Sequence, residues 1–130
     1  MQEVFEFLKK AGVWYLATDE DGVPHVRPFG AQNVFEDKLY IQTGLRKAVA
    51  QQMLKNPKIE ISGMADGKWI RLCAEAVLDE RIEAQEAMLE ANPALKSMYQ
   101  AGDGNTAVFY LKNATCTFCS FTEEPRTVSF

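Results

Sequence analysis

The sequence is poor in the residues that build metal centres and disulfide frameworks. Its 130 residues include one histidine, His25, and three cysteines. A lone histidine offers no metal-ligand spacing, and an odd cysteine count argues against a secreted disulfide scaffold. Cys116 and Cys119 form a C-x-x-C pair, but residues three apart in a strand point to opposite faces. We therefore expect no metal site and three structural cysteines.

Two further absences narrow the function. No stretch approaches the ~18 consecutive apolar residues of a membrane helix, and the first residues are acidic where a secretory signal needs basic ones. The formal net charge is −4, so the average field repels a phosphate backbone. These features predict a cytoplasmic protein that binds neither membranes nor nucleic acids. Any anion site must be a local basic cluster.

Hydrophobic and charged residues are present in ordinary amounts. They make up 47% and 25% of the chain, as in globular domains generally. The length fits one domain, and no linker, repeat or low-complexity tract interrupts it. We expect a single domain over residues 1–130.

Hydrophobic periodicity predicts short helices interspersed among antiparallel strands. Helices are expected over residues 2–11, 45–55 and 80–91, the last with Asp79 as N-cap, followed by a helical turn to residue 99. Strands are expected over residues 13–18, 23–34, 38–43, 58–64, 68–78 and 107–121, with a short strand after them. The first strand is apolar on both faces and should be buried. The chain is predicted to be mainly β (α+β), a small antiparallel barrel with peripheral helices.

The segment Thr43-Gly44-Leu45-Arg46-Lys47 breaks a charge rule that the other helices obey. Arg46 and Lys47 fall in the first turn of the helix predicted over residues 45–55, where the helix dipole disfavours cations. A bound anion would make both cations, the free N–H groups and the Thr43 hydroxyl favourable. The alternative is a solvated basic turn.

Two predicted strands carry unusual residues outside the core. Trp69 and Arg71 share the non-core face of strand 68–78, which suits a partner surface or an aromatic ligand. A plain amphipathic surface pair is the alternative. Pro24 and Pro28 leave strand 23–34 with missing N–H donors. Open backbone beside Arg27 can bind the polar edge of a heterocycle, or the prolines simply protect an edge strand.

Taken in order, these segments resemble the pyridoxamine 5′-phosphate oxidase-like, FMN-binding split-barrel family. The chain is most similar to its short nitroimidazole-resistance (Nim-type) proteins. The resemblance spans nearly the whole chain, through a leading helix and the segments PHVRPFG, LYIQTGLRKA, NPKIEISG and KWIRLCAEA. It implies a six-stranded antiparallel split β-barrel with peripheral helices. It also implies a homodimer with two FMN sites at the dimer interface.

Matched residue by residue, the resemblance implies flavin contacts from two strands. Arg27, Pro28 and Phe29 match the strand that lies along the isoalloxazine edge. Gln42 and Thr43 match the strand end beside the ribityl chain and phosphate.

The resemblance also implies a phosphate site and a contribution from the second subunit. Lys47 matches the phosphate-binding lysine, with Arg46 beside it. Trp69 and Arg71 match a hairpin strand that reaches flavin bound mainly by the other protomer.

The implied activity is that of an FMN-dependent oxidoreductase, which passes electrons from a reduced nicotinamide to a small acceptor such as a nitroaromatic. The flavin carries the redox chemistry, and no triad or dyad stands out, so no catalytic residue is assigned. The segment that binds pyridoxal phosphate in true pyridoxamine-phosphate oxidases has no match, so that activity is not expected. The alternatives are a flavin- or haem-binding protein for storage or sensing and a cofactor-free dimeric module. A deazaflavin in place of FMN also stays open.

Overall fold

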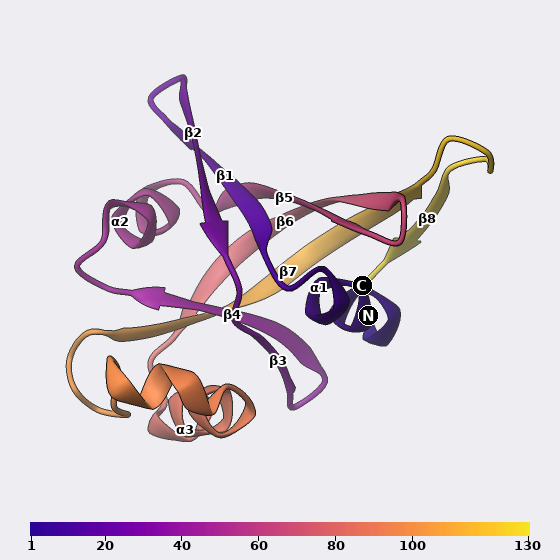
Figure 1. Cartoon of the computed structure of the whole chain (residues 1–130). Helices are drawn as coiled ribbons and strands as arrows, with labels where there is room; N and C mark the ends of the chain where they lie inside the picture. The colour runs from indigo at the N-terminus through magenta and orange to yellow at the C-terminus, as the bar shows by residue number, and fades with distance from the viewer.

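The computed structural model describes all 130 residues and confirms a mainly β chain with peripheral helices (Figure 1). The elements, in order, are α1 (Gln2–Ala11), β1 (Trp14–Glu20), β2 (Val23–Phe29), β3 (Gln32–Phe35), β4 (Lys38–Gly44), α2 (Ala48–Lys55), β5 (Lys58–Ala65), β6 (Lys68–Asp79), α3 (Ile82–Ala91), the 3₁₀ helix η1 (Pro93–Ser97), β7 (Thr106–Cys119) and β8 (Arg126–Ser129). No helix is long and apolar enough to cross a membrane.

The strands form one antiparallel sheet that curls into a split barrel. Its order is β2-β1-β5-β6-β7-β4-β3, with β8 paired to β7. β2 and β3 lie at opposite ends of this order, yet only Gly30 and Ala31 separate them in the chain. The sheet must therefore bend until its two ends meet, as Figure 1 shows. No ladder joins β2 to β3, so the barrel stays open along that line.

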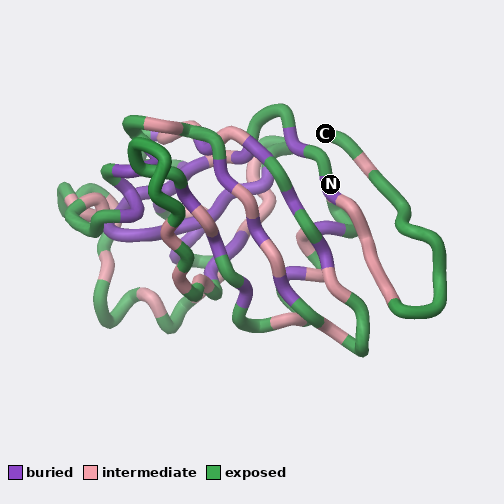
Figure 2. Tube along the Cα trace, turned by 90° about the horizontal axis from the view of Figure 1, so that it is seen from above, coloured by how far each residue is buried: buried purple, intermediate pink, exposed green.

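The core fills the barrel and extends under α3. Twenty buried residues form the main cluster, into which α1 inserts Val4 and Leu8. A smaller cluster lies between α3 and the outer face of β4 and β7, and contains Ala31, Tyr40, Ala84, Met88 and Val108. Figure 2 shows the buried positions alternating with exposed ones along the strands, as a sheet with one covered face requires. The helix α3 is thus fixed against the part of β4 that leads to the candidate site.

A partly buried polar network at the end of β6 fixes α3. The Tyr40 hydroxyl donates to Asp79 at 2.7 Å, and the Arg81 guanidinium donates to the same carboxylate at 2.9 Å. Arg81 also reaches Glu36 at 2.8 Å. Hydrogen bonds from Arg81, together with that from Tyr40, lower the pKa of Asp79 to about 2. Burial, followed by the bond to Asp79, raises the pKa of Tyr40 to about 12.

Several sequence expectations about element boundaries are wrong. The strand expected over residues 23–34 is two strands, because the chain bends at Gly30 and Ala31 between the two sheet ends. Asp79 ends β6 and is not the N-cap of α3, which is Arg81. The carboxylate is occupied instead by Tyr40 and the Arg81 side chain, although the Arg81 backbone N–H also donates to it at 3.1 Å.

The expected burial of the first strand is also wrong, whereas the sequence of the last long strand also predicts a bulge near Lys112-Asn113, which is confirmed. β1 is buried on one face only, and Tyr15 on the other face is 51% exposed. In β7, Asn113 has a φ of 52°, and the β6–β7 register shifts between Cys73 and Glu75.

Candidate functional site

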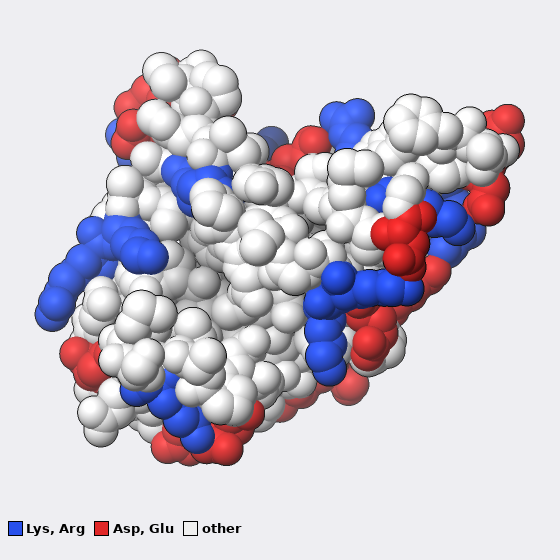
Figure 3. Space-filling model, in the orientation of Figure 1, with Lys and Arg blue, Asp and Glu red and all other residues white.

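A pocket of about 580 Å³ opens where β2, β4 and the α3–η1 segment meet. This volume lies within the range of small-molecule sites. Figure 3 shows a hollow of uncharged atoms on this face with basic groups at its rim. The lining comes from three parts of the chain: Pro28, Phe29, Gly30 and Ala31; Gln42, Thr43 and Lys47; and Ala91, Asn92, Pro93, Ala94, Leu95, Met98 and Tyr99.

Gln42 at the end of β4 is a lining residue with a buried side-chain amide. Gln42 follows Tyr40 by two residues and pairs with Val108, so it lies on the sheet face that α3 covers. Its side chain is 5% exposed, yet neither Oε1 nor Nε2 has a hydrogen-bond partner. Leaving a buried polar group unpaired costs about 1–3 kcal/mol. A group of this kind in a pocket is one that a ligand can satisfy.

An aromatic stack supports the β2 side of the pocket. The Phe29 ring stacks on Trp14 with centroids 5.2 Å apart. The Trp14 indole in turn donates from Nε1 to Gln32 at 2.8 Å. Because Trp14 is fully buried, it holds Phe29 in one orientation. The pocket therefore has a preorganised flat wall, which favours a planar ligand.

Lys47 is the only charged residue in the lining. On the same helix Lys55 pairs with Asp21 at 3.2 Å, whereas Lys47 pairs with no carboxylate. No side chain caps the N-terminus of α2. An anion is therefore the ligand charge that this pocket favours.

The prediction that Arg46 and Lys47 occupy the first turn of the helix is wrong. α2 begins at Ala48, and Lys47 is its N-cap with extended backbone. The preceding turn is closed by the bond from Lys47 N to Gly44 O at 3.0 Å, and the Arg46 N–H donates to Asn105 Oδ1 at 3.0 Å. Arg46 does not line the pocket.

Gly44 allows Tyr99 to pack closely beside the pocket. A Cβ at this position would lie 3.1 Å from the Tyr99 hydroxyl and 3.2 Å from Asn105 Nδ2. The glycine between Thr43 and Lys47 therefore serves the fit of the η1 wall in this chain.

Arg27 is not among the pocket-lining residues, although Pro28 and Phe29 are. Its guanidinium donates to Gln52 Oε1 at 2.6 Å and to Thr18 Oγ1 at 2.8 Å. Burial lowers the pKa of Arg27, and the group forms no ion pair. In this chain Arg27 ties α2 to β1 and β2.

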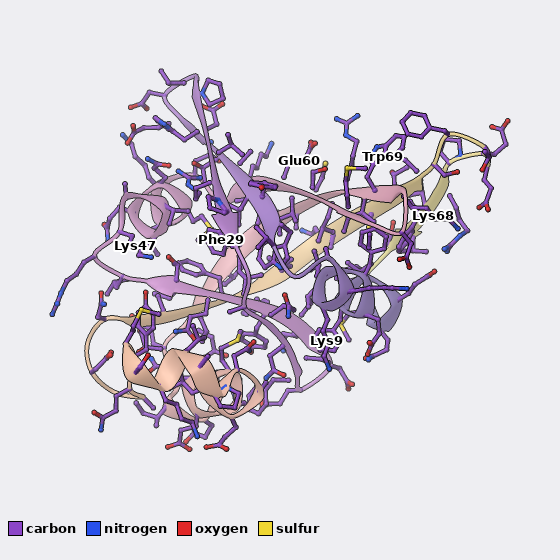
Figure 4. The ribbon with its side chains drawn as sticks, viewed as in Figure 1. Lys9, Phe29, Lys47, Glu60, Lys68 and Trp69 are labelled. Atoms are coloured by element: carbon purple, nitrogen blue, oxygen red, sulfur yellow. The ribbon has the colours of Figure 1, made fainter.

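Trp69 and Arg71 lie far from the pocket of their own chain. Figure 4 places Trp69 near the tip of the β5–β6 hairpin, across the molecule from Phe29 and Lys47. The Trp69 ring packs at 5.0 Å from Phe121, and Arg71 pairs with Glu60 at 3.2 Å. Their predicted contact with flavin of a second subunit stays a prediction.

The α3–η1 wall escaped the sequence analysis. The sequence signal that could have indicated it is the run of Leu95, Met98 and Tyr99 after the Asn92-Pro93 turn. A short helical turn cannot bury apolar side chains by itself, so they must pack on another part of the molecule or on a ligand. Met98 is 69% exposed in the chain. No histidine, cysteine or acidic residue lines the pocket, so the lining offers no carboxylate or imidazole for acid–base catalysis.

Comparison with known proteins gives the fold a family. The model of the pyridoxamine 5′-phosphate oxidase family matches residues 1–120. The chain belongs to this family. The crystal structure of a NimC/NimA family protein from Clostridium acetobutylicum matches this chain with a TM-score of 0.97 and 49% sequence identity. The match covers 100% of this chain and 92% of that protein. The predicted Nim-type resemblance is confirmed.

More distant members of the split-barrel group share the fold. A pyridoxamine 5′-phosphate oxidase-related, FMN-binding protein from Nostoc punctiforme matches at 15% identity, with a TM-score of 0.61 and coverage of 99% and 95%. HutZ, the haem storage protein of Vibrio cholerae, matches at 20% identity, with a TM-score of 0.63 and coverage of 85% and 87%. No curated protein matches the sequence significantly.

Proposed function

We propose that this protein binds FMN in the pocket between β2, β4 and η1 and acts as an oxidoreductase. The observation that carries the proposal is the unpaired amide of Gln42 in an apolar pocket whose single charge is Lys47. FMN combines a flat ring, a polar ring edge and a phosphate. The pocket offers a flat wall, an unsatisfied amide and a cation.

The residues present fit this cofactor. Lys47 and the Thr43 hydroxyl would hold the phosphate end, where the uncapped start of α2 adds its dipole. Pro28 and Phe29 would pack on the ring, with Phe29 fixed by Trp14. Arg27 would help to hold α2 in place beside the pocket, because its guanidinium donates to Gln52 in the middle of that helix.

Bound FMN would supply the redox chemistry, taking a hydride from a reduced nicotinamide and passing electrons to a small acceptor such as a nitroaromatic. The lining contains no carboxylate or imidazole, so the role of the chain is to bind, to orient and to exclude water. Leu95 and Met98 would shield the ring from solvent. Oxidation of pyridoxamine phosphate is not part of the proposal.

The proposed working unit is a homodimer with the cofactor at its interface. The single chain exposes large apolar side chains near the β5–β6 hairpin and on β1, including Met64 (61%), Phe121 (88%) and Tyr15 (51%). Exposed apolar surface of this kind is typical of subunit contacts. Trp69 and Arg71 would then reach a site held mainly by the partner subunit. The cytoplasmic location stays a prediction.

The visible spectrum of protein purified without added cofactor tests the proposal. Flavin absorption, or quenching of flavin fluorescence on titration with FMN, is the expected result. A Soret band would instead identify the haem-binding alternative. The spectrum of a deazaflavin would show that a deazaflavin is bound in place of FMN. A colourless protein that does not bind FMN would contradict the proposal.

Steady-state turnover separates an enzyme from a storage or sensing protein. Protein loaded with FMN should oxidise a reduced nicotinamide when a nitroaromatic acceptor is added. Stable FMN binding without turnover across nicotinamides and acceptors would favour the non-catalytic alternative.

A further inference from the structure

Asn105, the residue before β7, holds the turn that joins β4 to α2. Its backbone carbonyl accepts from the Leu45 N–H at 2.6 Å, and its side-chain Oδ1 accepts from the Arg46 N–H at 3.0 Å. The next N–H, that of Lys47, donates to the Gly44 carbonyl at 3.0 Å. Each N–H from Leu45 to Lys47 therefore has a partner, and Asn105 supplies the partners of the first two.

Asn105 is itself fixed by the carboxylate of Asp103. Asp103 Oδ1 accepts from the N–H groups of Asn105 at 2.8 Å and of Thr106 at 2.6 Å. Its Oδ2 accepts from the Gln100 N–H and from the Thr106 hydroxyl, both at 3.0 Å. These bonds, that from the Thr106 N–H above all, lower the pKa of Asp103, so the carboxylate stays ionised at neutral pH. The loop before β7 is thus ordered by its own bonds and presents Asn105 to the turn.

We propose that Asn105 is a positioning residue for the phosphate of a bound ligand and acts through Lys47. Lys47 is the charged residue of the pocket lining, and no carboxylate holds its side chain. A bond from Lys47 to a phosphate must offset the entropy lost when the lysine and its backbone are ordered. Asn105 fixes that backbone before the ligand binds, so more of the bond energy appears as affinity.

This inference rests on the proposed FMN site and adds a residue that does not line it, since Asn105 is absent from the pocket lining. Gly44 leaves room for the contact, because a Cβ there would lie 3.2 Å from Asn105 Nδ2. A second asparagine makes the same kind of bond at the other end of α2. Asn56, the C-cap of that helix, accepts at Oδ1 from the Lys58 N–H at 3.2 Å. Asn56 does not line the pocket and is therefore a matched control.

The binding test measures the affinities of Asn105→Ala for FMN and for riboflavin, which lacks the phosphate, by fluorescence quenching. Loss of the bond to the Arg46 N–H should weaken FMN by about fivefold and leave riboflavin close to its wild-type affinity. Asn56→Ala should keep the wild-type ratio of the two affinities. Equal losses for both flavins in Asn105→Ala would overturn the inference and leave the FMN site standing. Failure of the wild type to bind FMN would overturn the site and this inference together.

A double-mutant cycle tests whether Asn105 acts through Lys47. In protein that already carries Lys47→Ala, the change Asn105→Ala should cause no further loss of FMN affinity. The same loss in the presence and in the absence of Lys47 would mean that Asn105 does not position it, and the inference would be wrong. If the alanine variant does not fold, Asn105→Ser takes its place with the same expected results, because serine keeps a small polar side chain and the backbone bond from Leu45.

Discussion

Lys47 illustrates how one side chain can set the charge preference of a whole pocket. The molecule is acidic overall, but within the lining Lys47 has neither an ion-pair partner nor a competing carboxylate. A cation in a partly enclosed site interacts more strongly with a bound phosphate than it would in open water. Its effect should therefore depend on whether the ligand carries a phosphate.

The Lys47→Ala variant is expected to weaken FMN by about tenfold or more, since a charge-assisted bond is worth about 1.5–3 kcal/mol. Riboflavin, which lacks the phosphate, should bind the variant almost as well as the wild type. Arg46→Ala is the control, because Arg46 precedes Lys47 but does not line the pocket, and its effect should be several-fold smaller. Equal losses of affinity for FMN and riboflavin would show that Lys47 does not bind the phosphate. Fluorescence titration measures both ligands.

Arg27 has contacts within the chain that the sequence motif did not indicate. The resemblance puts Arg27 along the flavin, whereas the structure gives its donors to Gln52, Thr18 and a β1 carbonyl. The sequence offers no sign of these partners, because Gln52 lies 25 residues away and only the fold brings it close.

Replacing Arg27 by Met should lower the free energy of unfolding by about 1–3 kcal/mol, because Thr18 and Gln52 lose a partly buried donor. The free energy of riboflavin binding should change by less than the free energy of unfolding does, because Arg27 does not line the pocket. Urea unfolding and riboflavin titration on the same variant separate the two effects. A variant of wild-type stability that no longer binds riboflavin would return Arg27 to the flavin site.

Among the elements, α3 and η1 matter most, because they form the pocket wall while their anchor lies at the end of β6. Asp79 holds α3 through Arg81 and holds β4 through Tyr40. The Asp79 carboxylate is 9% exposed and the Arg81 side chain is 48% exposed, so solvent screens the bond from Tyr40 less than the bond from Arg81.

The anchor predicts an acid limit of stability. The pKa of Asp79 is about 2 in the folded chain, below its ordinary value of 3.8. The ionised form therefore stabilises the fold fully above pH 3.8, and its contribution, about 2 kcal/mol, is lost as the pH falls through about 2. Urea unfolding between pH 6 and pH 2 should show that the free energy of unfolding falls less with acid in Asp79→Asn than in the wild type. An identical pH dependence in both proteins would contradict this assignment.

Elements marked by local signals were predictable from the sequence. The hairpin turns at Asp21-Gly22 and Asp66-Gly67 have the positive φ angles that these residues favour, and the helix of residues 2–11 ends at Gly12 as expected. The pocket residues Pro28, Phe29, Gln42, Thr43 and Lys47 were also named in advance. The helix and the helical turn to residue 99 were predicted, but their place beside the pocket and the partners of Asp79 and Arg27 were not predictable, because tertiary contacts define them.

For the whole molecule, the proposal divides each site between two chains. Lys47 and Trp69 lie at distant points of one chain, so a shared site requires that they act together across the dimer. Two inactive variants should then complement each other.

Mixing Lys47→Glu with Trp69→Ala under conditions of subunit exchange should restore about a quarter of the high-affinity FMN sites. At random, about half of the dimers are mixed, and one of the two sites in each mixed dimer carries both wild-type residues. Flavin titration of the mixture, beside each variant alone, measures the recovery. Absence of recovery, with exchange shown by mass spectrometry, would mean that Trp69 contributes nothing to the partner's site.

The pairing of β4 with β7 has a consequence for how the protein is made. Gln42 lies opposite Val108, and Thr43 opposite Ala107, so one side of the pocket is built from segments far apart in the chain. During synthesis the strand β4 leaves the ribosome long before its neighbour exists, and contacts of such long range form slowly. The pocket is therefore among the last parts of the chain to become complete. A nascent chain cut before β7 would keep Lys47 and Gln42 but would lack the strand that pairs with β4 beside them.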